Sequence, residues 1–152
     1  MNAFEVVPLT AEHLPAVAEL ERLCFGEPWS EQALTLLLGE DAVALCCLGE
    51  AGEAIAYCGM VTVLDEGQIT NVAVHPRCRR MGCGRALMTA LLACAERRAL
   101  AQISLEVRIS NRAAIALYEG VGFRRAGVRK RFYKNPCEDA WVMLWEIGER
   151  TV

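Results

Sequence analysis

A basic, glycine-containing segment near the middle of the chain constrains the fold more than any other feature. Residues 79–86 read Arg-Arg-Met-Gly-Cys-Gly-Arg-Ala and stand between an apolar stretch at 68–74 and an amphipathic stretch at 84–98. Gly82 and Gly84 allow a ligand to approach the backbone closely, and the first turn of a helix carries unpaired N–H groups. The segment therefore predicts a strand–loop–helix unit whose loop binds an anion such as a pyrophosphate. Positive charge would come from Arg79, Arg80 and Arg85.

A plain structural turn is the alternative interpretation of this segment, because Gly-x-Gly also occurs in ordinary turns. The segment is not a Walker loop, since no Gly-Lys-Ser/Thr follows it. It also lacks the third glycine of a dinucleotide-binding fingerprint. The glycine spacing alone thus leaves phosphate binding and a structural turn both open.

Length and composition favour one packed domain over residues 1–152. Of the 152 residues, 54% are hydrophobic and 23% are charged, which excludes a disordered chain. No uncharged stretch approaches the roughly 20 apolar residues that a membrane-spanning helix requires. The first residues have neither the basic flank nor the apolar run of a secretory signal. We therefore expect a cytoplasmic protein without membrane contact.

The two halves of the chain carry opposite charge. Residues 1–75 contain twelve acidic residues and one arginine (net −11), whereas residues 76–152 contain seven acidic and fifteen basic residues (net +8), which together give −3. A basic region suggests an anionic ligand and an acidic region a cationic one. We therefore expect the phosphate site on the second half and a cationic acceptor on the first. The alternative is that two faces of one domain simply differ in charge.

Eight cysteines raise the possibility of disulfides or a zinc site. No pair has the two-residue gap of a zinc knuckle, and the chain has only two histidines. Most of the cysteines lie in apolar segments, where a free thiol behaves as a small hydrophobic side chain. Without a secretory signal, we expect reduced thiols and no metal.

Hydrophobic periodicity and turn residues predict a mixed α/β sheet. Expected strands lie at 4–8, 42–48, 54–64, 68–74, 103–107, 123–128 and 141–145. Expected helices begin after Thr10 and at 30–39, 84–98 and 111–120. The unit from 68 to 107 reads as strand, helix and strand, which predicts a right-handed crossover between parallel strands.

A second segment, in combination with the glycine loop, resembles a known family. Residues 111–123 supply Asn-x-x-Ala-x-x-Leu-Tyr-x-x-x-Gly-Phe, and residues 79–84 supply Arg-x-x-Gly-x-Gly. Both patterns, in this order and about 30 residues apart, resemble the GCN5-related N-acetyltransferase (GNAT) superfamily. The resemblance implies acetyl-CoA as co-substrate, without a metal. It also implies the GNAT fold, a mostly antiparallel mixed sheet of about six to seven strands with helices on both faces.

Further segments narrow the resemblance to the RimI branch, the ribosomal-protein-alanine N-acetyltransferases. These segments are 25–31, 71–76, 105–111, Tyr133 and 138–140. The resemblance spans nearly the whole chain and implies acetylation of the N-terminal alanine of a small-subunit ribosomal protein. Two segments depart from the pattern, an extra Gly26-Glu27 and a shorter stretch at 134–137. Both are expected near the entry of the acceptor peptide.

Glu106 and Tyr118 are the residues that the resemblance makes catalytic. Alternation along 103–108 places Glu106 on the strand face opposite Leu105, where it is a candidate general base. The alternative is a solvated carboxylate paired with Arg108. Tyr118 is the candidate general acid, because a phenol is protonated at neutral pH. The alternative is a core aromatic beside Phe123.

The remaining site residues also follow from the resemblance. Those implied to bind acetyl-CoA are Val72, Ala73, Val74, Arg79, Arg80, Met81, Gly82, Cys83, Gly84, Arg85 and Asn111. Asn111 is equally a helix N-cap. Trp29 and Tyr133 are expected at the acceptor entrance, although Trp29 also suits a hydrophobic staple before the helix at Ser30.

Two alternative functions stay open at this point. One is acetylation of lysine side chains or small amines by the same fold; the other is a non-catalytic acyl-CoA-binding module, which would need neither Glu106 nor Tyr118. The basic residues of 124–134, with Phe132 and Tyr133 among them, suggest either a solvated hairpin or an RNA-contacting patch. We expect at most transient ribosome contact and no stable nucleic-acid binding, because the chain is acidic overall.

Overall fold

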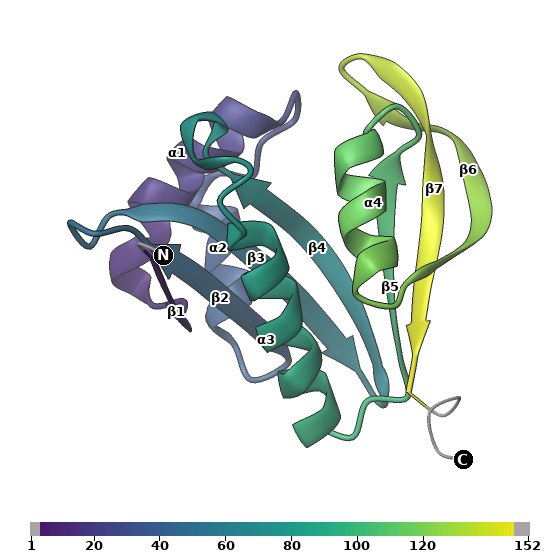
Figure 1. Cartoon of the computed structure of the whole chain (residues 1–152), viewed down its shortest axis with the longest axis horizontal. Helices are drawn as coiled ribbons and strands as arrows, with labels where there is room; N and C mark the ends of the chain where they lie inside the picture. The colour runs from purple at the N-terminus through teal and green to yellow at the C-terminus, as the bar shows by residue number, and fades with distance from the viewer. Residues whose placement is uncertain (1–3, 148–152) are drawn as a thin grey trace.

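A computed structural model describes residues 4–147 and shows a seven-stranded sheet with helices on both faces (Figure 1). The strands are β1 Glu5–Pro8, β2 Ala42–Leu48, β3 Ala54–Val63, β4 Glu66–Val74, β5 Gln102–Arg108, β6 Arg124–Lys134 and β7 Cys137–Glu146. The α-helices are α1 Leu14–Cys24, α2 Glu31–Leu34, α3 Cys83–Arg97 and α4 Arg112–Gly120. Single 3-10 turns cover Ala11–His13, Thr35–Leu38 and Pro76–Cys78. The predicted mixed α/β sheet is confirmed.

The strand order is β1-β2-β3-β4-β5-β7-β6. Every neighbouring pair is antiparallel except β4 and β5, which are parallel and are joined through α3. The predicted crossover between parallel strands is confirmed. It puts the glycine loop at the carboxyl end of β4, directly before α3.

The parallel pair comes apart along its length, as the two diverging arrows in Figure 1 show. Only Glu66, Gly67 and Gln68 pair with β5, opposite residues 102–104. From Ile69 onward β4 pairs only with β3, and from Leu105 onward β5 pairs only with β7. One edge of β4 is therefore left without a strand partner at the centre of the molecule.

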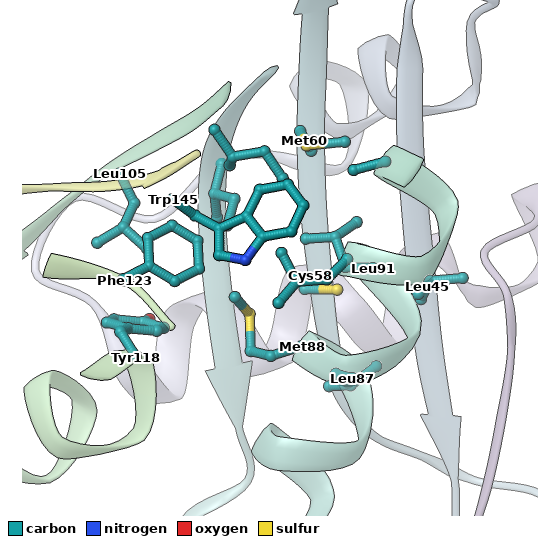
Figure 2. Close-up of a cluster of buried hydrophobic side chains, with 14 of the residues drawn as sticks. Leu45, Cys58, Met60, Leu87, Met88, Leu91, Leu105, Tyr118, Phe123 and Trp145 are labelled. Atoms are coloured by element: carbon teal, nitrogen blue, oxygen red, sulfur yellow. The ribbon is translucent and has the colours of Figure 1, made fainter. Parts of the chain in front are cut away.

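Two hydrophobic cores lie on opposite faces of the sheet. Neighbouring residues of β3 serve different cores: Tyr57 packs with α1, and Cys58 packs with α3. Figure 2 shows the α3 face, where Leu87, Met88 and Leu91 of α3 meet the sheet and Trp145 lies between these side chains and Phe123. This alternation follows from the two-residue period of a strand.

A β-bulge in β4 exchanges the two faces part-way along the strand. Gly59 pairs with Asn71 but Met60 pairs with Ile69, so Thr70 is an extra residue. Ile69 belongs to the core on the α3 face, whereas Ala73, four residues later, belongs to the core on the α1 face. In an unbroken strand both would lie on one face. The bulge therefore turns Asn71 and Ala73 toward α1.

Three predicted boundaries are corrected by the structure. The β3–β4 turn is Leu64-Asp65 and not 65–67, because Gly67 is a buried strand residue whose added Cβ would lie 2.6 Å from Met60 Sδ. The helix expected at 30–39 changes into a 3-10 turn at Thr35. The closing strands are longer than expected, and β6 extends through the basic stretch as far as Lys134.

All eight cysteines are free thiols, and Cys46, Cys47, Cys58 and Cys83 are buried. Burial raises the pKa of Cys46 to about 11 and that of Cys58 to about 12, so both remain protonated and apolar in character. Within residues 4–147, no helix is long and apolar enough to span a membrane.

Candidate active site

Two cavities open where β4 and β5 separate. The first, which we call the α3 cavity, has a volume of about 540 Å³ and lies against the glycine loop and the start of α3. The second, the β5 cavity, has a volume of about 620 Å³ and is walled by the end of β5 and by loops of the α1 face. Both are lined by the same six residues at their junction: Cys24, Phe25, Val72, Asn111, Ala114 and Tyr118. The site is thus a passage from one face of the sheet to the other.

Backbone amides gather at the glycine loop, as the sequence predicts. Gly82 is the N-cap of α3 with a φ of +90°, and Arg80 has a φ of +66°. The first backbone bond of the helix runs from the Ala86 N–H to the Gly82 carbonyl. The amides of residues 83–85 therefore have no acceptor within the helix and point out of the N-terminal end of α3. This is the geometry of an anion site.

The loop is fixed to β4 and packed against α4. The Arg79 Nε donates to the Val74 carbonyl at 3.3 Å, and the Cys24 thiol donates to the same oxygen at 3.4 Å. A Cβ added to Gly84 would lie 3.0 Å from Leu117 of α4. Gly84 therefore allows α3 and α4 to approach closely on either side of the α3 cavity.

The residues predicted to bind the cofactor do not all face the α3 cavity. Residues 72–74, 79, 80 and 82–85 line it, as does Asn111. Met81 is 40% exposed and lies outside the lining, because its side chain points to solvent. The Cys83 side chain is buried in the core, so this residue offers its backbone only.

Asn111 begins α4, and its Oδ1 accepts a hydrogen bond from the Ala114 N–H at 3.2 Å. The N-cap interpretation is therefore confirmed. Asn111 also lines both cavities, which leaves its amide nitrogen available to a ligand.

Tyr118 stands at the junction of the two cavities. Its ring packs at a tilt against Phe123, with 6.0 Å between the ring centroids (Figure 2). Within residues 4–147 its hydroxyl forms no hydrogen bond, and it is not among the fully enclosed polar atoms. Burial raises the pKa of Tyr118, with further contributions from Tyr133 and Cys58. The phenol therefore keeps its proton at neutral pH and is free to donate it.

Glu106 lies on the wall of the β5 cavity with 9% of its side chain exposed. Along β5 the buried residues Ile103, Leu105 and Val107 alternate with less buried ones, as expected. The carboxylate is paired with Arg129 of β6, with Oε2 3.3 Å from the Arg129 Nε. The alternative interpretation of Glu106 paired this carboxylate with Arg108, and that prediction is wrong.

Arg108 serves a different carboxylate. Its Nη1 lies 3.2 Å from Glu138 Oε1 and donates to the Pro136 carbonyl at 2.8 Å. Its guanidinium lies 4.3 Å from the centroid of the Tyr133 ring. Arg108 thus fixes the β6–β7 loop and Tyr133 on the rim of the β5 cavity. Burial raises the pKa of Tyr133 to about 12.

The two segments that depart from the family pattern touch each other above the β5 cavity. Gly26, Glu27, Asn135 and Pro136 all line it. A Cβ added to Gly26 would overlap the Asn135 carbonyl oxygen, so the α1–α2 loop and the β6–β7 loop are in direct contact there. Trp29 lines the same cavity and also packs on the core of the α1 face, so its roles at the acceptor entrance and as a hydrophobic staple both stay predictions.

The expected division of charge between the halves is only partly correct. The second half supplies the anion loop, but the β5 cavity takes residues from both halves, including 24–27, 29, 69–72, 105–108, 132, 133, 135 and 136. Its charged lining residues are Glu27, Glu106 and Arg108. Pairing of β5 with β7, and of β7 with β6, brings the basic half to this side as well.

Sequence reasoning missed Glu21. This residue is fully buried on α1 and accepts three hydrogen bonds, from Trp29, Tyr57 and Asn71. A signal was present, because Glu21 follows Leu14 by seven residues and Val17 by four. Those spacings belong to the buried stripe of a helix.

Comparison with known proteins decides the family. The sequence model of the acetyltransferase (GNAT) family matches residues 14–123. This chain belongs to the GNAT family.

Similar GNAT proteins share almost the entire chain. The [ribosomal protein bS18]-alanine N-acetyltransferase of Escherichia coli (strain K12) is 39% identical over 142 residues, which cover 92% of this chain and 95% of that protein. N-alpha-acetyltransferase RimI of Mycobacterium tuberculosis is 32% identical, over 93% of this chain and 91% of that protein. The crystal structure of the ribosomal-protein-S18-alanine N-acetyltransferase from Escherichia coli superposes with a TM-score of 0.87 at 37% identity, covering 95% of this chain and 94% of that one.

GNAT enzymes use acetyl-CoA, and the α3 cavity of this GNAT protein fits that molecule. The loop offers unpaired amides and exposed arginines to a pyrophosphate, and the free edge of β4 offers backbone groups to a chain lying beside it. Among residues 4–147, no group of three His, Cys, Asp or Glu side chains is arranged to hold a metal ion.

Proposed function

We propose that this chain transfers the acetyl group of acetyl-CoA to the N-terminal α-amine of a protein, the N-terminal alanine of ribosomal protein bS18. The observation that carries the proposal is the junction of the two cavities at Tyr118, with the Glu106 carboxylate on the acceptor side. The Escherichia coli relative that is named for this acceptor matches 92% of the chain, which supports the same acceptor.

Acetyl-CoA would lie in the α3 cavity with its pyrophosphate on the loop amides and on Arg79, Arg80 and Arg85. Residues 72–74 and Asn111 would contact the arm that leads to the thioester. Acetyl-CoA supplies an activated acetyl group, and the protein orients that group at the junction. The acceptor amine would then enter from the β5 cavity, on the other side of the sheet.

Glu106 acts as the general base. It takes a proton from the acceptor ammonium, the nitrogen forms a bond to the acetyl carbon, and the carbon–sulfur bond breaks. Tyr118 donates its proton to the departing thiolate, and the second proton that the nitrogen sheds on becoming an amide returns to the Tyr118 phenolate. An α-amino group has a pKa of about 7.7–8.0 against about 10.4 for lysine, so a carboxylate frees the N-terminal amine far more readily.

The rim of the β5 cavity supports an acceptor with a small first residue. Trp29 and Tyr133 both line the cavity, and the contact between Gly26 and Asn135 bridges it. A chain end with an alanine side chain passes such a rim more easily than a bulky residue does. Transient contact between the basic residues of β6 and the ribosome stays a prediction.

Mass spectrometry of a peptide with both kinds of amine tests the proposal. The peptide begins with alanine and carries one internal lysine, and the protein is supplied with acetyl-CoA. We expect the acetyl group on the N-terminus. Acetate mainly on the lysine would favour the lysine-acetylating alternative, and acetyl-CoA binding without any transfer would favour a non-catalytic module.

A further inference from the structure

Glu21 is the one charged residue in the fully buried set of the described chain. Its Oε1 accepts a hydrogen bond from the Trp29 N–H at 2.8 Å. Its Oε2 accepts two more, from the Tyr57 hydroxyl at 2.5 Å and from Asn71 Nδ2 at 2.8 Å. The carboxylate therefore ties together α1, the α1–α2 loop, β3 and β4.

Stability alone does not explain a carboxylate at this position. Removing an ionised group from water is costly, and well-packed apolar side chains in place of buried charges are often neutral or stabilising. The core of the α1 face contains such fully buried apolar side chains, including Val17, Leu20 and Leu34. What a carboxylate adds here, and an apolar residue cannot, is the orientation of its hydrogen-bond donors.

Two of those three donors belong to residues of the β5 cavity, Trp29 and Asn71. An asparagine side chain can present either its nitrogen or its oxygen to a neighbour, but both oxygens of Glu21 accept hydrogen bonds, and Oε2 accepts the one from the Asn71 nitrogen. Glu21 therefore holds the nitrogen of Asn71 and leaves the oxygen for the opposite side. The bulge at Thr70 has already turned Asn71 to the α1 face of the sheet.

Glu106 lies on the wall of the β5 cavity that faces Asn71. It lies on β5 and, by strand alternation, also points to the α1 face, because Leu105 and Val107 belong to the core of the α3 face. β4 and β5 have no backbone pairing at this level, so the gap between Asn71 and Glu106 belongs to the β5 cavity. An amine placed there meets a carboxylate on one wall and an amide oxygen on the other.

We propose that Glu21 is a positioning residue that turns the Asn71 carbonyl oxygen toward the acceptor amine, which it binds opposite Glu106. The inference rests on the proposed function, because it assigns a contact to the acceptor of that reaction. One N–H of the amine is held by Asn71 while Glu106 removes a proton, which directs the nitrogen lone pair toward the junction with the α3 cavity. Glu21 touches neither substrate and acts through Asn71.

Steady-state kinetics on the full chain test this with an alanine-initiated peptide and acetyl-CoA. Asn71→Ala should raise the KM for the peptide about tenfold, the loss expected for one hydrogen bond to a charged or reacting group. Glu21→Gln keeps the volume but no longer dictates which end of the Asn71 amide faces it, so it should raise the same KM by a smaller factor. The KM for acetyl-CoA should stay unchanged in both. Glu19→Gln is the matched control, because Glu19 lies on the exposed side of α1 and pairs only with Arg22.

The double variant Glu21→Gln/Asn71→Ala separates positioning from a merely structural role. If Glu21 acts through Asn71, the double variant has the same peptide KM as Asn71→Ala alone. Multiplied effects, or an unchanged peptide KM in Asn71→Ala, would overturn the inference while the proposed function stands. Asn71→Ala decides alone if Glu21→Gln does not fold. A wild-type chain that transfers no acetyl group to the peptide would overturn both proposals.

Discussion

The α3 cavity and the β5 cavity meet at the same six residues, yet the chain builds them in different ways. The α3 cavity is made largely from two continuous segments, 72–85 and 111–118, and its ligand groups are backbone amides and arginines. The β5 cavity is assembled from five segments, and its polar groups are side chains held by other side chains. Backbone groups suit a ligand shared by a whole family, whereas side chains and loops set the choice of acceptor.

The largest expected effect tests whether proton transfer depends on a residue of the β5 cavity. Glu106→Gln should lower turnover by roughly 10²–10⁴-fold, the usual contribution of a positioned proton-transfer group. Binding of acetyl-CoA, measured by calorimetric titration, should be unchanged because Glu106 does not line the α3 cavity. The control is Glu119→Gln, an exposed carboxylate on α4 that pairs with Arg125. Full activity of Glu106→Gln over pH 6–9 would remove Glu106 from the mechanism.

Tyr118→Phe tests one of the six residues that line both cavities. Loss of the phenolic proton should lower kcat by a factor in the same roughly 10²–10⁴ range and leave both KM values near normal. Tyr133→Phe is the contrast, since Tyr133 lines only the β5 cavity and should change the acceptor KM instead. Steady-state kinetics with each substrate varied would separate the two. A normal kcat in Tyr118→Phe would leave Tyr118 as a packing residue beside Phe123.

Gly82→Ala should weaken acetyl-CoA binding in the α3 cavity and leave the β5 cavity unchanged. An added Cβ would meet nothing within 4 Å, but the φ of +90° strains any residue other than glycine. We expect about tenfold weaker acetyl-CoA binding, because relief of about 1–3 kcal/mol of strain would reshape the loop. In the wild type, acetyl-CoA at 100 times its Kd should raise the free energy of unfolding by about 2.7 kcal/mol. Gly127→Ala on β6 is the control, because it has open space and no positive φ.

A smaller effect should distinguish acceptor peptides by charge. Peptides with arginine or lysine behind an initial alanine should react a few-fold faster than the same peptides with acidic residues, because Glu27 and Glu106 line the β5 cavity. The preference should shrink as salt rises, since screening acts over about 10 Å at 0.1 M. Competition assays at two salt concentrations would measure it. A preference that does not respond to salt would point to direct contacts and not to steering.

The smallest expected effect concerns the pH dependence of stability. Hydrogen bonds from Ser110 and Arg108 hold the pKa of Glu138 below its usual value. The carboxylate therefore stabilises the fold above its unfolded pKa of about 4.3, and this contribution is lost as the pH falls through the lower folded pKa. The difference in unfolding free energy between the wild type and Glu138→Gln should vanish in acid. A constant difference between pH 7 and pH 3 would contradict this.

Local patterns in the sequence determined the elements and the α3 side of the site. The alternation of Leu105, Glu106 and Val107 placed Glu106 off the core, and the spacing of Leu87, Met88 and Leu91 gave the buried face of α3. The glycine loop was predictable because its function depends on a strand, a turn and a helix that follow one another directly. All of these features are set by residues within a few positions of each other.

The tertiary structure alone decided the acceptor side. The bulge at Thr70 exchanges the faces of β4, and the separation of β4 from β5 after three paired residues opens the passage. Pairing of Glu106 with Arg129 and burial of Glu21 beneath Asn71 join residues 23 and 50 positions apart. No local pattern specifies such contacts, because they form only when distant segments pack together and bury their polar groups against one another.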